Sequence, residues 1–111
     1  KCTVIFQPHL YSRTRDLANG FAEVLDLADE VILLPIYPAR ELPIEGVNSE
    51  MILLRMKNDN RSVMAKPALL DWIKDEYVPS VNKEFGEVLI TAGAGDIDTL
   101  IEPIKNELKK I

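Results

Sequence analysis

Blocks of apolar and polar positions along the chain predict strands that alternate with helices. Short apolar runs near residues 2–6, 31–36, 62–65 and 87–91 have the length and side-chain content of buried strands. Between these runs, apolar residues recur at helical spacing. Because each crossover is about 20 residues long, consecutive strands are expected to run parallel. The pattern therefore predicts an α/β fold, a Rossmann-like open parallel sheet of about four strands with helices on both faces.

Caps and prolines predict where the helices begin and end. We expect the first helix to begin near Thr14, with Ser12 or Thr14 as its N-cap. Its buried stripe is expected at Leu17, Phe21, Val24, Leu25 and Ala28. Pro79 is expected to stop the third helix, and Pro103 predicts a kink or a fresh start in the last one.

Composition narrows the class of protein. A chain of 111 residues, with 47% hydrophobic and 28% charged residues, fits one globular domain spanning 1–111. A net charge of −5 argues against a nucleic-acid surface, and no apolar run approaches the length of a membrane span. The single Cys2 cannot form an intrachain disulfide, which fits a cytoplasmic location.

Three candidate ligand segments, 7–16, 37–48 and 91–98, each follow a predicted strand. In a parallel sheet they emerge at the same edge, where ligands of open α/β sheets bind. The first segment carries His9, Tyr11 and Arg13. An arginine beside a helix start is disfavoured by the helix dipole unless an anion offsets it. The alternative is that His9 is an ordinary solvated side chain and that Arg13 pairs with a surface carboxylate such as Asp16 or Glu41.

Three blocks of sequence carry a resemblance to a known family. The blocks FQPHLYSRTRDL, VILLPIYPARELPIEGVNSE and LITAGAGDID resemble, in this order, the C-terminal domain of the Mur ligases. The resemblance implies an ATP-dependent ligase of peptidoglycan synthesis, with L-alanine, UDP-N-acetylmuramate and ATP as partners and ATP and Mg²⁺ as cofactors of the full-length enzyme. It also implies that this chain is an N-terminally truncated fragment that lacks the central and N-terminal domains.

The resemblance implies roles for individual residues. His9, Tyr11 and Arg13 would contact the amino-acid or muramyl substrate, with Glu41 in the pocket wall. Leu10 stands where the family commonly has arginine, and Arg40 stands where many relatives have glycine. The Leu10 departure places more of the anion-binding role on Arg13, or else indicates a different pocket.

The glycine-rich turn supplies four further candidates, Gly93, Ala94, Gly95 and Asp96. Amides at a helix start can hold a carboxylate or phosphate. The dinucleotide pattern is incomplete, because Asp98 stands where a third small residue is needed. The alternative is a tight strand-to-helix turn in which glycines supply unusual backbone angles.

The sequence lacks a G-x-x-x-x-G-K-[ST] loop, a metal-ligand cluster and an evident catalytic residue. We therefore expect the fragment alone to bind neither ATP nor Mg²⁺ and to be inactive. Two other functions stay open: a paralogous ligase domain that joins a whole peptide to the muramyl sugar, and an autonomous, non-catalytic module that binds an anion or nucleotide. An interaction domain that uses the exposed loop of residues 37–47 is a third possibility.

Overall fold

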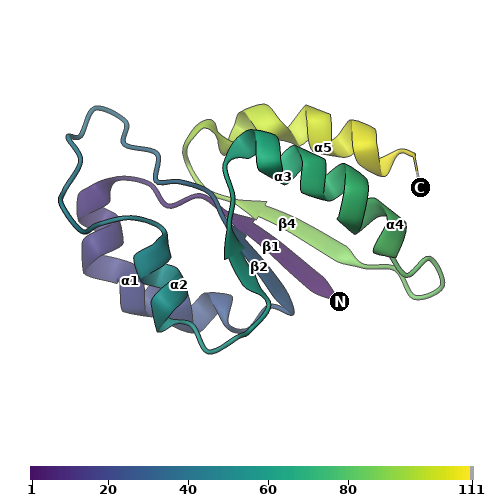
Figure 1. Cartoon of the computed structure of the whole chain (residues 1–111), viewed down its shortest axis with the longest axis horizontal. Coiled ribbons are helices and arrows are strands. Elements are labelled where there is room, and N and C mark those ends of the chain that lie inside the picture. Colours follow the sequence, from purple (N-terminus) through teal and green to yellow (C-terminus); the bar gives the residue numbers. More distant parts are fainter. Residues whose placement is uncertain (111) are drawn as a thin grey trace.

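The computed structural model describes residues 1–110 and contains one four-stranded, all-parallel sheet with helices on both faces (Figure 1). The sheet order is β3-β2-β1-β4. The strands are β1 (Cys2–Phe6), β2 (Glu30–Leu33), β3 (Arg61–Val63) and β4 (Val88–Ala92). The α/β fold class and the parallel pairing predicted from the sequence are confirmed. Strand β2 ends three residues earlier than predicted, since Pro35 cannot donate to the ladder.

Two helices cover one face of the sheet. They are α1 (Tyr11–Leu25) and α2 (Glu50–Arg55), and they pack on Val31 and Leu33 of β2. Helix α1 approaches the sheet through the small side chains of Ala18 and Ala22, which are almost fully buried. The predicted stripe is therefore partly wrong: Leu17 and Val24 are 47% and 67% exposed, because they lie beside the Ala18–Ala22 contact rather than in it.

The other face is covered by a longer helical layer. Its elements are α3 (Lys66–Trp72), the π-helical turn η1 (Ile73–Tyr77), α4 (Val78–Ser80), the 3₁₀ turn η2 (Asp96–Leu100) and α5 (Ile101–Leu108). Together they enclose a core that includes Ile5 and Ile32 of the sheet, both completely buried. Figure 1 shows α3 and α5 lying side by side above the sheet.

Prolines explain two irregularities of this layer. Pro79 does not stop the helix as predicted; it lies inside α4, directly after η1. In η1 the Val78 amide donates to the Ile73 carbonyl five residues back, and this wider turn relieves the clash that a proline ring makes in a regular helix. The fresh start expected near Pro103 is confirmed, since η2 gives way to α5 at Ile101.

Apolar surface is open along β4, an edge strand. Val88 and Ile90 are 56% and 43% exposed. They pair with Cys2 and Val4 and so lie on the same side of the sheet as α1, where Leu17 and Val24 are also exposed. Within residues 1–110, no helix has the length and hydropathy needed to cross a membrane.

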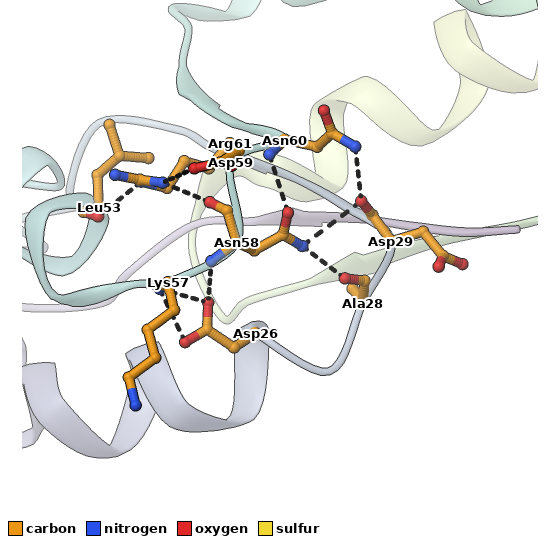
Figure 2. Close-up of polar contacts among 9 residues, drawn as sticks. All are labelled: Asp26, Ala28, Asp29, Leu53, Lys57, Asn58, Asp59, Asn60 and Arg61. Carbon is orange, nitrogen blue, oxygen red and sulfur yellow. Dashed lines mark hydrogen bonds and ion pairs between the residues drawn. The ribbon is translucent and has the colours of Figure 1, made fainter.

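A polar clasp at the amino ends of the strands joins the α1–β2 connection to the α2–β3 connection (Figure 2). The Asp26 carboxylate accepts the backbone amides of Lys57 and Asn58, each at 3.0 Å. The Asn58 side chain donates to the Ala28 carbonyl at 2.7 Å and accepts the Asn60 amide at 2.8 Å. These contacts, which we call the clasp, fix the amino edge of β2 and β3.

Candidate functional site

The three predicted segments do meet at the carboxyl ends of the strands, and Gln7 is the residue that joins two of them. Its backbone amide donates to the Ala92 carbonyl at 3.0 Å. Its side-chain nitrogen donates to Asp96 Oδ1 at 2.6 Å, and its side-chain oxygen accepts the Ile97 amide at 2.8 Å. Gln7 is only 4% exposed. Sequence reasoning missed this residue, although a polar side chain between a buried strand and Pro8 was a usable signal.

A short main-chain ladder joins the first segment to the second. The Leu10 amide donates to the Tyr37 carbonyl and the Tyr37 amide donates to the Pro8 carbonyl, both at 2.9 Å. This places the His9 ring parallel to the Tyr37 ring, with 5.9 Å between centroids and 16° between planes. Nδ1 of His9 is buried and has no hydrogen-bond partner within the described residues. The main-chain pairing of His9 with Tyr37 therefore orients the imidazole, but it leaves one ring nitrogen without a hydrogen bond.

Helix α1 begins at Tyr11, three residues earlier than predicted, and neither predicted cap forms. The N-cap is Leu10, whose backbone φ of 69° is unusual for a bulky residue. Thr14 lies inside the helix and donates its hydroxyl to the Leu10 carbonyl at 2.8 Å. Ser12 Oγ donates to Glu41 Oε2 at 2.5 Å, and the Ser12 amide donates to Glu41 Oε1 at 2.8 Å. The cap predictions are wrong because the Glu41 carboxylate, from the 37–48 loop, accepts the amide and the hydroxyl of Ser12 at the helix start.

The charge of Glu41 is stabilised by this arrangement. The bonds from the Ser12 hydroxyl and then from the Ser12 amide hold the pKa of the Glu41 carboxyl below its usual value. Arg15 contributes a weaker electrostatic attraction in the same direction. Glu41 is thus an ionised group fixed inside the candidate site, with both oxygens engaged by Ser12.

Arg13 projects from the first turn of α1 and is exposed. No carboxylate among residues 1–110 lies within ion-pair distance of it. The two carboxylates expected to pair with Arg13 have other partners, since Asp16 pairs with Arg15 at 2.9 Å and Glu41 binds Ser12. The salt-bridge alternative for Arg13 therefore finds no support in the structure, and its guanidinium is accessible to a ligand.

Packing accounts for the glycines of the 93–96 turn. A Cβ on Gly95 would lie 2.5 Å from Cβ of Tyr37, and a Cβ on Gly93 would lie 2.9 Å from the Gln7 carbonyl oxygen. Gly93 also has a φ of 148°. These contacts favour the tight-turn interpretation over the dinucleotide pattern. Ala94 is exposed at the tip of the turn.

Asp96 is already paired on two sides. It forms an ion pair with Lys66 at the start of α3 and accepts a hydrogen bond from the side-chain amide of Gln7. The bonds from Lys66 and then from Gln7 keep the pKa of the Asp96 carboxyl below its usual value. In addition, the Ile97 backbone amide donates to the side-chain oxygen of Gln7. This turn therefore has fewer free polar groups for a ligand than the sequence suggested.

Two open clefts flank the chain that leaves β2. One, of about 270 Å³, lies between Gln7, Tyr37, Lys66 and Asp96. The other, of about 250 Å³, lies between Tyr11, Pro43, Val47 and Ser49, and the two share Pro35 and Ile36. Tyr11 thus lines a cleft. No cluster of three or more potential metal ligands occurs within residues 1–110.

Comparison with known proteins gives the relatives of the chain. No family model matches it. It is 48% identical over 110 residues to the UDP-N-acetylmuramate--L-alanine ligase of Flavobacterium johnsoniae, covering 99% of this chain and 23% of that protein. It is 49% identical over 105 residues to the ligase of the same name from Cytophaga hutchinsonii, covering 95% and 21%. The chain is a homologue of part of these ligases.

The homology confirms the resemblance seen in the sequence. The relative from Porphyromonas gingivalis, also named UDP-N-acetylmuramate--L-alanine ligase, is 47% identical over 107 residues and is covered to 22% of its length. The chain thus spans less than a quarter of the length of the curated relatives it matches. Similarity of this kind runs through nearly the whole chain, so it includes the three segments at the carboxyl edge.

Proposed function

We propose that this chain is a single domain, the C-terminal domain of an ATP-dependent ligase that adds L-alanine to UDP-N-acetylmuramate in cytoplasmic peptidoglycan synthesis. The observation that carries the proposal is the 45–49% identity to UDP-N-acetylmuramate--L-alanine ligases along nearly all of the chain. The names of these relatives favour L-alanine over the peptide substrate of a paralogous ligase.

The residues of this chain do not fit ATP phosphates or Mg²⁺. The sequence contains no G-x-x-x-x-G-K-[ST] loop, and the described residues contain no carboxylate cluster suited to a metal. In the proposal, both groups are therefore held by other parts of the ligase. The isolated chain is expected to show no ligase or ATPase activity, and turnover by rigorously purified chain would contradict the proposal.

The contribution of this domain is substrate positioning and charge neutralisation. Arg13 supplies a guanidinium whose donors are not used inside the described chain, and guanidinium is suited to bidentate binding of a carboxylate. L-alanine and the muramyl group each carry a carboxylate. His9 and Tyr11 lie on the same segment and shape the surroundings of that charge. Holding the two reactants in place lowers the barrier without any proton transfer by this domain.

The test is Arg13→Lys in a ligase that contains this segment. Loss of a charge-assisted, bidentate contact is expected to cost about 1.5–3 kcal/mol, or roughly ten- to a hundredfold in kcat/KM. KM should rise for L-alanine or UDP-N-acetylmuramate and stay constant for ATP. Arg15→Lys is the matched control, because Arg15 lies two residues further along α1 and is paired with Asp16. Equal effects of the two variants would remove Arg13 from the site.

A second candidate is the autonomous module that binds an anion or nucleotide by itself. The exposed guanidinium of Arg13 is the observation that favours it. Calorimetric titration of the isolated 111-residue chain with ATP and with L-alanine separates the two functions. Saturable binding at micromolar concentrations would support the autonomous module, whereas no binding is expected for a domain that completes a larger site.

A further inference from the structure

Helix α1 has no capping side chain of its own. The first amides of a helix have no partner within it, and a side-chain oxygen at the N-cap usually accepts one of them. Leu10 occupies the N-cap and offers no such oxygen. Instead, the Glu41 carboxylate, 29 residues further along the chain, accepts the Ser12 amide and the Ser12 hydroxyl. An anion is also favoured at this end of the helix dipole.

The turn that carries Glu41 is held in an uncommon conformation. Ala39 has a φ of 55°, and the Glu41 amide donates to the Pro38 carbonyl at 2.8 Å across it. Within residues 1–110, Ala39 and Leu10 are the non-glycine residues with positive φ. Both lie between the Tyr37 ladder and the contact of Glu41 with Ser12. Such conformations persist only where the surrounding contacts fix them.

We propose that Glu41 is a positioning residue: its carboxylate caps α1 from the neighbouring loop and so locks the 37–41 turn to the helix turn that bears Tyr11 and Arg13. The sequence had suggested Glu41 as a pocket-wall residue that meets the substrate. In the structure both of its oxygens are engaged by Ser12, which gives it an internal role. This role does not depend on the identity of the ligand, so it goes beyond the proposed function.

The test is Glu41→Gln in the 111-residue chain, with Glu45→Gln as matched control. Glu45 lies in the same loop, is exposed and makes no hydrogen bond or ion pair within residues 1–110, so its variant carries the same charge change without the contact. Glu41→Gln should speed hydrogen exchange of the Ser12 amide about tenfold or more, as loss of a charged acceptor implies. The Lys57 and Asn58 amides of the clasp should keep their exchange rates.

Two further readouts separate positioning from a general loss of structure. The Ser12 amide proton resonance should move upfield in Glu41→Gln alone, because its shift reports the acceptor directly. Trypsin should cut after Arg40 several-fold faster in Ser12→Ala, which removes the hydroxyl bond to Glu41 and leaves the residues around the cleaved bond unchanged. The proposal is overturned if Glu41→Gln and Glu45→Gln behave alike, or if Ser12→Ala leaves cleavage unchanged.

Discussion

The two ends of the sheet differ in how fully their polar groups are hydrogen-bonded or ion-paired. At the amino end, the clasp pairs the Asp26 carboxylate and the Asn58 amide with backbone groups of two connections (Figure 2). At the carboxyl end, His9 keeps an unsatisfied Nδ1 and Arg13 has no ionic partner in the described chain. The described residues at the amino end pair these polar groups with one another, whereas at the carboxyl end His9 Nδ1 and Arg13 are left unpaired.

Backbone conformation shows the same contrast. The residues of the clasp have no positive φ, whereas Leu10 and Ala39 at the carboxyl end both do. Departures from ordinary conformation and from full hydrogen bonding tend to gather at functional sites, where stability is given up for geometry. Substitutions in the clasp are therefore expected to change stability, and substitutions at the carboxyl end to change binding.

The largest effect is expected from breaking the clasp with Asn58→Ala. The change removes the bond to the Ala28 carbonyl and the bond from the Asn60 amide. At about 1 kcal/mol for each bond, the free energy of unfolding should fall by about 2 kcal/mol. Urea unfolding followed by circular dichroism measures it. Asn19→Ala, on the exposed side of α1, is the control and should be neutral or slightly stabilising because alanine favours helix.

A smaller, pH-dependent effect is expected at Asp26. The Asn58 and Lys57 amides lower the pKa of its carboxyl in the folded chain. A carboxyl whose folded pKa is depressed contributes stability above its unfolded pKa, near 3.9, and loses it as pH falls through the folded value. Wild type should therefore lose its advantage over Asp26→Asn between about pH 5 and pH 3. Asp71→Asn, at an exposed position, is the matched charge control.

The fold could be predicted from the sequence because burial on both faces leaves a strong signal. The run Val31-Ile32-Leu33-Leu34 is entirely buried, as a strand covered on both sides requires. Parallel pairing then placed the three candidate segments at one edge. The burial of α1 was predicted less well, since Ala18 and Ala22 make the close contact while the larger Leu17 is exposed. Size of an apolar side chain does not reveal which face approaches the sheet.

Contacts between distant segments could not be predicted. The cap of α1 comes from Glu41, and local capping rules see only Ser12 and Thr14. The role of Gln7 depends on the position of Asp96, which lies 89 residues further along the chain. For the candidate site, the sequence predicted that the three segments converge at one edge of the sheet, but not which polar groups are already paired. That information exists only once the loops are folded against each other.

A modest gain in stability is expected from Ala39→Gly at the carboxyl end. Ala39 is exposed and has a φ of 55°, a conformation that costs a residue with a Cβ about 1 kcal/mol more than glycine. The added freedom of glycine in the unfolded chain offsets part of this, so the net gain should be at most about 1 kcal/mol by urea unfolding. Ala68→Gly, at an exposed helical position, should instead destabilise. A loss of stability in Ala39→Gly would mean that the turn holds no strain.

The smallest effect on stability is expected from Arg13→Ala, and this completes the contrast between the two ends. The side chain is exposed and makes no ion pair within residues 1–110. Removing it also takes a cation from the amino end of α1, where the helix dipole disfavours positive charge. The free energy of unfolding should therefore change by less than about 0.5 kcal/mol, or rise slightly. Equilibrium urea unfolding of the isolated chain, run beside Asn58→Ala, measures this directly. A loss as large as that of Asn58→Ala would show that Arg13 serves the fold, and the distinction between a stabilising amino end and a ligand-ready carboxyl end would fail.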